Sequence, residues 1–228
     1  MRLILIRHGQ TPSNVLGRLD TDRPGPGLTE LGSEQARALP DALAGEPISA
    51  LYASVLVRTQ LTAAPLAEAL GLETEVLPGI HEIEAGALEK RSDRESVVAY
   101  LETVWAWGQG EMDRAMPGGG TDGTTFFARF DADIAELAQR HPADATVAVV
   151  SHGAAIRVWA AGPDSNLPPR FTAERDLGNT GIVILEGEPG AWTVVSWQGE
   201  PVGGADLDDE AARDVTGEPA SEAVDEAD

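Results

Sequence analysis

Short apolar runs alternate along the chain with segments whose apolar residues recur at helical spacing. The runs predict strands over 2–7, 49–53, 73–77, 146–150, 181–186 and 192–197. The intervening patterns predict helices over 29–44, 55–70, 94–107, 122–141 and 153–161. Strands that alternate with helices are typical of βαβ units. The pattern therefore predicts an α/β fold with a mostly parallel sheet.

Residues rich in Gly, Pro and Asp predict loops over 12–28, 117–123 and 162–178. Within the predicted helices, Pro40 and Pro65 are expected to kink or shorten the helix that contains them. From residue 200 onward the chain has 11 acidic residues and one basic residue, with almost nothing large and apolar. We expect this tail, 200–228, to be disordered, with an acidic interaction arm as the less favoured alternative.

Composition narrows the class of protein. The 38 acidic and 16 basic residues give a net charge of −22, which argues against a nucleic-acid or anionic-membrane partner. An anionic ligand would need a local cluster of cations. The chain has no cysteine, so thiolate catalysis and Cys-based zinc sites are excluded. Without an apolar run long enough for a signal peptide or a membrane span, we expect a cytoplasmic protein.

Two of the four histidines follow predicted strands in parallel contexts. His8 lies in "ILIRHGQT" and His152 in "VAVVSHGAAIR". Ligands bind outside the carboxyl ends of parallel strands, so both imidazoles are expected at the same sheet edge. Either His-Gly pair alone would more often be a histidine in a strand-to-helix turn. Together, with the free N–H groups of a following helix, they predict a phosphate site.

A phosphate needs fixed positive charge, and the planar fork of arginine suits two of its oxygens. Arg7 ends the first predicted strand, where a buried charge requires a partner. Arg58 follows the second strand, in "YASVLVRTQLTAA". Alone, Arg58 would be read as a solvent-facing helix residue. With Arg7, His8 and His152, it completes a cluster of two arginines and two histidines.

These residues carry a resemblance to a known family. "RHGQT" with Asn14, "LTELG", "YASVLVRTQLTA", "PGGGT" and "VVSHGAAIR" resemble the histidine phosphatase superfamily, in order, from about residue 1 to residue 197. The branch is the one that contains cofactor-dependent phosphoglycerate mutases and their phosphatase relatives. The resemblance implies a three-layer sandwich, with helices on both sides of the central sheet, over a domain of residues 1–199.

The resemblance also implies roles for individual residues. His8 would attack phosphorus to form a phosphohistidine, while Arg7, Arg58 and His152 hold the equatorial oxygens. Glu82 would protonate the leaving oxygen, with Glu84 as a close competitor for that role. The residues expected to bind substrate are Arg7, Gly9, Thr11, Asn14, Arg58, His152 and Gly153. No metal and no cofactor is expected.

Three functions remain open at this point. "SHGAAIR" resembles the phosphatases more than the mutases, and paired arginines are missing beyond the acid, so hydrolysis of a phosphomonoester is favoured over mutase activity. A non-catalytic protein that binds a phosphorylated ligand is the third possibility. The expected partner is a phosphorylated small molecule, and relatives suggest a homodimer. Trp105, Trp107 and Phe126 either line the substrate pocket or belong to the core.

Overall fold

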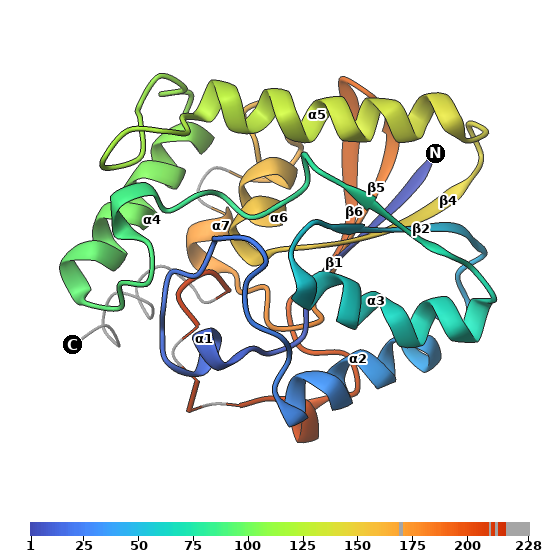
Figure 1. Ribbon diagram of the computed structural model, residues 1–228. Coiled ribbons are helices and arrows are strands. Elements are labelled where there is room, and N and C mark those ends of the chain that lie inside the picture. The colour runs from blue at the N-terminus through green and yellow to red at the C-terminus, as the bar shows by residue number, and fades with distance from the viewer. Residues whose placement is uncertain (169–170, 210, 213, 218–228) are drawn as a thin grey trace.

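A six-stranded sheet forms the centre of the computed structural model, which describes residues 1–168, 171–209, 211–212 and 214–217 (Figure 1). The strand order is β3-β2-β4-β1-β5-β6. The strands are β1 (Arg2–Arg7), β2 (Ile48–Ser54), β3 (Thr74–Leu77), β4 (Thr146–Ser151), β5 (Ile182–Glu188) and β6 (Ala191–Gln198). The pairs β1·β4, β2·β4 and β2·β3 are parallel, and β5 runs antiparallel to β1 and β6. The predicted α/β fold with a mostly parallel sheet is confirmed.

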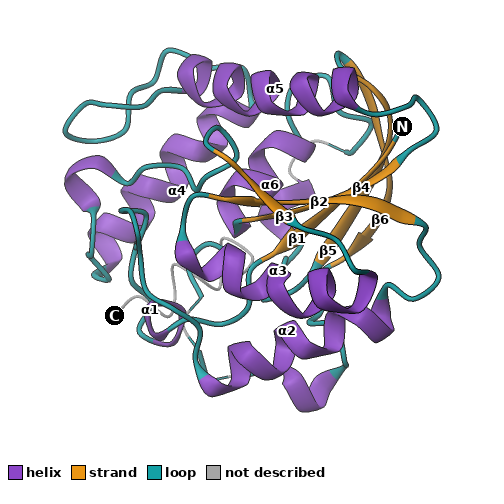
Figure 2. Cartoon of the chain, turned by 45° about the vertical axis from the view of Figure 1, so that its right-hand side comes forward, coloured by secondary structure: helices purple, strands orange, loops and turns teal. Residues whose placement is uncertain are grey.

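Helices cover both faces of this sheet, as a three-layer sandwich requires (Figure 2). The longer helices are α2 (Glu30–Ala42), α3 (Val57–Leu70), α4 (Arg94–Gly108), α5 (Gly123–Arg140) and α6 (Gly153–Ala160). Helices α2 and α3 lie on one face, and α5 and α6 lie on the other (Figure 1). Within the described residues, no helix combines the length and apolar character that crossing a membrane requires.

The alternation of side chains along β1 explains the two layers. Leu3 and Leu5 pack into the core that includes residues of α4, α5 and α6, whereas Ile4 and Ile6 pack into the core against α2 and α3. All four side chains are fully buried. Successive strand residues point to opposite faces, so an uninterrupted apolar run is what a strand covered on both faces needs.

Local signals set the helix ends. Thr29, Asp93 and Asp122 cap the amino ends of α2, α4 and α5 with side-chain oxygens, and α3 ends at Gly71 in the left-handed conformation. Neither Pro40 nor Pro65 ends the helix that contains it. Pro40 lies in the last turn of α2, and α3 continues through Pro65 to Leu70 because Ala63 and Leu66 pack in the core.

The predicted loops contain short helices that the sequence analysis missed. Helix α1 (Pro12–Val15) begins with a capping box between Thr11 and Asn14, and proline occupies its first position. Helix α7 (Phe171–Glu174) also lies in a predicted loop, whereas the 3-10 helices η1 (Gly86–Leu88) and η2 (Ala205–Leu207) lie outside those loops. Four-residue helices carry no apolar periodicity, so the pattern could not predict them.

The acidic segment after residue 200 differs from the expected disordered tail. Its described part packs on the domain: Val202 and Val215 are buried, and the Gln35 side-chain amide donates to the Leu207 carbonyl at 2.8 Å. Asp214 is also buried, against a basic side chain described below. The acidic composition predicted a segment exposed to solvent, but a few apolar residues and one buried ion pair hold it against the domain. Residues 218–228 lie outside the described residues.

Candidate active site

The carboxyl ends of β1, β2 and β4 bring the predicted cationic residues together. Arg7, the last residue of β1, is in register with Ser151, the last residue of β4. The residues that follow, His8 and His152, have ring centroids 5.2 Å apart. Both rings are buried, with at most 2% of either residue exposed. The two His-Gly turns therefore form one site, as their parallel contexts predicted.

The His8 ring is held in one orientation. Its Nδ1 lies 2.8 Å from the Gly9 carbonyl oxygen, to which it donates, and the Asn179 amide donates to the His8 carbonyl. This assignment follows from the hydrogen bond and leaves the lone pair on Nε2. Burial, with the charges of Arg58 and Arg7, lowers the pKa of His8 well below its usual range. His8 is therefore neutral, with a nucleophilic nitrogen at neutral pH.

His152 is fixed from the neighbouring strand. Ser54, at the end of β2, has its hydroxyl 2.6 Å from Nε2 of His152. Burial and the charges of Arg58 and His8 lower the pKa of His152 well below its usual range. Its buried Nδ1 has no hydrogen-bond partner in the described part of the chain. A group that accepts a hydrogen bond at Nδ1 would satisfy this ring.

Arg58 projects from the first turn of α3 and is 3% exposed. Its Nη2 donates to the Asp20 carbonyl at 3.0 Å, whereas its buried Nε and Nη1 have no partner among the residues that the structure describes. Burial lowers its pKa, and its charge lowers the pKa of both His8 and His152. An anion would satisfy both the charge and the free donors of this buried cation, so this corner of the site favours an anionic ligand.

Arg7 is fully buried and its terminal nitrogens contact the C-terminal segment. Nη1 donates to the Leu177 carbonyl at 2.7 Å and pairs with the Asp214 carboxylate. Nη2 donates to Asp214 at 2.6 Å and to the Thr216 hydroxyl at 3.1 Å. The sequence predicted the buried charge at this strand end but gave no sign of its partner, which is 207 residues away.

The two candidate acids lie in different environments. Glu82 is 2% exposed, and burial raises the pKa of its carboxyl above the usual value although backbone donors and Arg58 oppose the shift. The Glu84 side chain is 43% exposed, contacts His81 Nε2 at 2.6 Å, and has its pKa lowered to about 2. Burial opposes that shift and is outweighed by the hydrogen bond from His81 and the charge of Arg129. Of the two carboxyls, Glu82 is therefore the one whose surroundings favour the protonated form.

The Glu82 carboxylate contacts the amino end of α6. Its Oε1 accepts the N–H groups of Ile83 at 2.9 Å and Ala155 at 2.8 Å, and Oε2 accepts from Ala154 at 3.3 Å. The sequence analysis expected this helix end to offer its N–H groups to a phosphate. In the structure those of Ala154 and Ala155 bind a side-chain carboxyl of the site.

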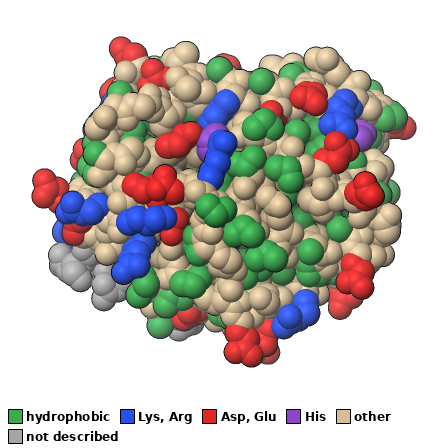
Figure 3. Space-filling view, in the orientation of Figure 1, with side chains coloured by type: hydrophobic (Ala, Val, Ile, Leu, Met, Phe, Trp, Pro, Cys, Tyr) green, Lys and Arg blue, Asp and Glu red, His purple; other side chains and the backbone are tan. Residues whose placement is uncertain are grey.

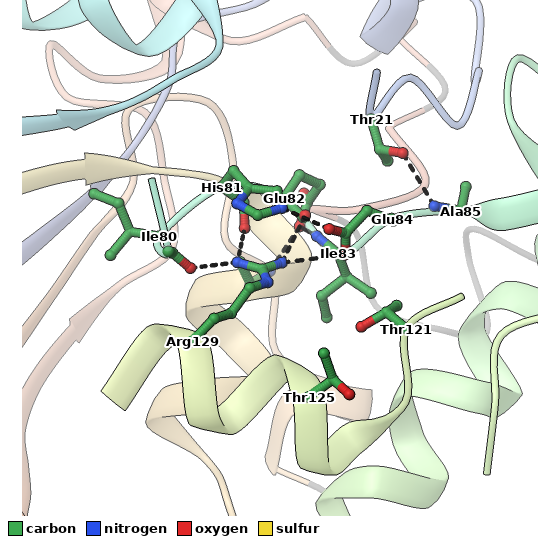
Figure 4. A network of polar contacts seen from close by, with 12 residues as sticks. Thr21, Ile80, His81, Glu82, Ile83, Glu84, Ala85, Thr121, Thr125 and Arg129 are labelled. Atoms are coloured by element: carbon green, nitrogen blue, oxygen red, sulfur yellow. Dashed lines mark hydrogen bonds and ion pairs between the residues drawn. The ribbon is translucent and has the colours of Figure 1, made fainter. Parts of the chain in front are cut away.

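Arg129, on α5, holds the segment that carries Glu82 (Figure 4). Its Nη1 donates to the carbonyls of Gly79 and His81, and Nη2 donates to the carbonyl of Glu82 at 2.8 Å. Four residues along α5, Asp133 accepts the Gly79 N–H at 2.5 Å. Helix α5 thus binds both a backbone N–H group and backbone carbonyl groups of the segment 79–82.

The remaining predicted substrate-binding residues, Gly9, Thr11, Asn14 and Gly153, lie near the same site and make contacts within the protein. The Gly9 N–H donates to the Thr62 hydroxyl at 2.9 Å, and Gly153 begins α6. Thr11 and Asn14 bind each other in the capping box, and the Asn14 amide also donates to Asp214 at 3.0 Å.

Several residues of the site were missed by the sequence analysis. They are Ser54, Thr62, Arg129, Asn179 and Asp214. Ser54 could have been found, because it ends a strand at the same sheet edge. Trp107 and Phe126 are fully buried and stack on each other, so they belong to the core. A surface hollow beside Met1 and Pro142 lies at the opposite sheet edge and takes no part in this cluster.

On the face shown in Figure 3, Lys and Arg side chains are interspersed with Asp and Glu. The cations of the site are buried beneath this surface rather than spread over it, since Arg7 and Arg58 are 0% and 3% exposed.

Comparison with known proteins gives consistent matches. The family described as "Histidine phosphatase superfamily (branch 1)" matches residues 3–199. The chain is 39% identical over 216 residues to the PE-PGRS family protein PE_PGRS11 of Mycobacterium tuberculosis, covering 89% of this chain but only 37% of that protein. It is 34% identical to phosphoserine phosphatase 1 of Hydrogenobacter thermophilus, covering 69% of this chain and 73% of that protein. The structure of a mycobacterial glucosyl-3-phosphoglycerate phosphatase in complex with VO3 aligns with a TM-score of 0.73 and 27% identity, covering 87% of this chain and 99% of that chain.

Proposed function

Because this chain belongs to branch 1 of the histidine phosphatase superfamily, we propose that it hydrolyses phosphomonoesters of small molecules through a phosphohistidine on His8. One observation carries the proposal. Three buried donors, Nε and Nη1 of Arg58 and Nδ1 of His152, lack partners within the described residues, and both side chains lie beside the neutral His8 ring. A phosphoryl group would supply the missing acceptors and the electrophile together.

In the first step, Nε2 of His8 forms a bond to phosphorus while the bond from phosphorus to the leaving oxygen breaks. Arg58 and His152 donate to the equatorial oxygens and stabilise the charge that they carry in the transition state. Glu82 gives its proton to the leaving oxygen, so the alcohol departs neutral. In the second step, water attacks phosphorus, Glu82 takes the proton of that water, and the bond to His8 breaks to release phosphate.

The contacts of Glu82 support its role as the acid. Both short hydrogen bonds to its carboxyl end on Oε1, as expected for the carbonyl oxygen of a protonated acid. Oε2 has the single longer contact, at 3.3 Å, and is the oxygen that can carry the proton. Glu84 is ionised at neutral pH, since its pKa is about 2.

Hydrolysis is favoured over phosphoryl transfer between two sites on one molecule. The relatives named above include phosphatases for phosphoserine and for glucosyl-3-phosphoglycerate. Both names describe phosphate esters of small metabolites. A substrate with a single phosphate needs only the cations of the buried site, whereas a mutase would need further cations to hold a second phosphate.

The test compares His8→Ala with a matched histidine substitution. Wild type should hydrolyse p-nitrophenyl phosphate. When turnover of a ³²P-labelled substrate is stopped with an alkaline denaturant, the protein should retain label on His8, and acid should release that label. His8→Ala should lose turnover by at least about a thousandfold. His141→Ala is the control, because His141 contacts Tyr52 at the far end of α5.

Retained turnover in folded His8→Ala would refute the proposed nucleophile. Phosphate binding by the wild type without turnover or labelling would indicate a binding protein instead. Interconversion of phosphoglycerate isomers without release of free phosphate would indicate a mutase.

A further inference from the structure

The described residues of the acidic C-terminal segment, 201–209, 211–212 and 214–217, reach the site through the carboxylate of Asp214. We propose that Asp214 occupies part of the phosphate-binding site and competes with the phosphoryl group for Arg7 and Asn14. The proposal rests on the proposed function, since it takes Arg7 to be a phosphate ligand. The segment then acts as an internal ligand that sets how tightly a substrate must bind.

The engagement of Arg7 is the first observation. A guanidinium carries five N–H donors, of which four are on the terminal nitrogens. Asp214 pairs with both Nη1 and Nη2, while Leu177 and Thr216 accept from the same two nitrogens. The fifth donor, on Nε, is buried and has no partner among the described residues. A phosphate can bind the guanidinium bidentately through both terminal nitrogens or through Nε and one of them. Asp214 accepts from both terminal nitrogens, so either mode competes with it.

Asn14 is the second observation. Its side-chain oxygen is taken up by Thr11 in the capping box, so only the amide nitrogen is free to bind a ligand. That nitrogen donates to Oδ1 of Asp214 at 3.0 Å, the same oxygen that accepts from Nη2 of Arg7. Two residues expected to bind one phosphate thus converge on a single carboxylate oxygen.

The segment around Asp214 is anchored by contacts that do not involve the phosphate ligands. Val215 is buried in the core, the Leu177 N–H donates to the Gly217 carbonyl at 2.8 Å, and Arg157 donates to the Thr216 carbonyl at 3.1 Å. These contacts hold the carboxylate at high local concentration beside Arg7. A phosphate dianion, with more charge and more acceptor oxygens, can displace it where a carboxylate ligand cannot.

The experiment measures binding of inorganic phosphate by titration calorimetry, in the full-length chain and without turnover. We expect Asp214→Asn and Asp214→Ala to bind phosphate about tenfold more tightly than wild type, because the competing charge is gone. Asp206→Asn is the matched control: it makes the same change of charge on an exposed residue of the segment, and its affinity should equal that of wild type. Unchanged or weaker binding in both Asp214 variants would overturn the proposal, since Asp214 would then only position Arg7.

A second measurement uses the unaltered chain, so it does not depend on how the variants fold. Saturating phosphate should speed hydrogen exchange of the amides in 214–217, because the carboxylate is displaced from Arg7. Slower exchange of these amides would contradict the competition. Because neither experiment needs catalysis, a chain that binds phosphate competitively but fails to hydrolyse esters would refute the proposed function alone.

Discussion

Arg129 donates a hydrogen bond of 2.8 Å to the backbone carbonyl of Glu82. The contact joins the middle of α5 to the segment that holds the proposed acid. The Arg129 side chain is 14% exposed and also binds the carbonyls of Gly79 and His81. A side chain that makes no contact with the nucleophile thereby fixes the position of the group that must protonate the leaving oxygen.

Replacing Arg129 should impair proton donation more than phosphoryl binding. Arg129→Met leaves three backbone carbonyls without their donor, which should lower the free energy of unfolding by about 2–4 kcal/mol. We expect kcat for alkyl phosphates to fall by at least about tenfold, and kcat for p-nitrophenyl phosphate, whose leaving group needs little protonation, to fall much less. Arg140→Met, which removes an exposed arginine of the same helix, is the control. Equal losses for both substrates would argue against a positioning role.

The raised pKa of Glu82 predicts how turnover depends on pH. The protonated carboxyl is the active form, so kcat for an alkyl phosphate should fall as pH rises through its pKa. Glu82→Gln should remove this falling limb along with most of the rate. The free energy of unfolding should change in the same direction. Because the pKa of Glu82 is higher in the folded state than in the unfolded chain, its contribution to stability is lost as pH rises above the unfolded pKa. Denaturant titrations at several pH values should show that loss in wild type and not in Glu82→Gln.

Glu84 predicts the opposite dependence. Its pKa is lowered to about 2, so the stability that it contributes is present above its unfolded value of 4.5 and is lost as pH falls toward 2. Because 43% of this side chain is exposed, solvent screening keeps the contribution small. Acid titration of Glu84→Gln should lack this part of the wild-type loss, while its turnover at neutral pH stays within a few-fold of wild type. A large drop in turnover would favour Glu84 as the acid.

Gly32 should be intolerant of any side chain. A Cβ at this position would overlap the Gln10 carbonyl oxygen and lie 2.8 Å from the Gln10 nitrogen, two residues beyond His8. Gly32→Ala should therefore destabilise the fold by about 1–3 kcal/mol and shift the His8 turn. Gly45→Ala makes the same substitution where nothing lies within 4 Å, so its melting temperature should be close to that of wild type. Thermal melts and p-nitrophenyl phosphate turnover test both.

Much of the fold and the convergence of the site follow from the sequence pattern. An apolar run that ends in a charged residue marks a buried strand and its functional end, and this logic placed Arg7, His8 and His152 at one sheet edge. It also applies to Ser54, which ends β2 but lies one residue beyond the predicted strand 49–53 and was not predicted as a site residue. What the pattern predicts is position along a strand, and strand ends coincide in a parallel sheet.

The contacts that the pattern could not predict are those made across long stretches of sequence. Asp214 lies in a segment whose composition indicates disorder, yet its ion pair with a buried arginine and the burial of Val215 beside it hold that segment on the domain. Arg129 reads as one of several charges on an amphipathic helix. Nothing in its spacing shows that it binds backbone carbonyls 47 to 50 residues earlier. Pairing of this kind depends on tertiary packing, which periodicity does not record.

Strand β1 is hydrogen-bonded to β4 on one side and to β5 on the other, over nearly its whole length. His8 follows its last residue directly. In a protein the amides of such a strand open only when the whole domain unfolds. The proposed nucleophile is thus attached to the strand that is expected to unfold last. Heat inactivation and unfolding should then proceed at one rate, and residual activity would report the fraction of molecules that remain folded.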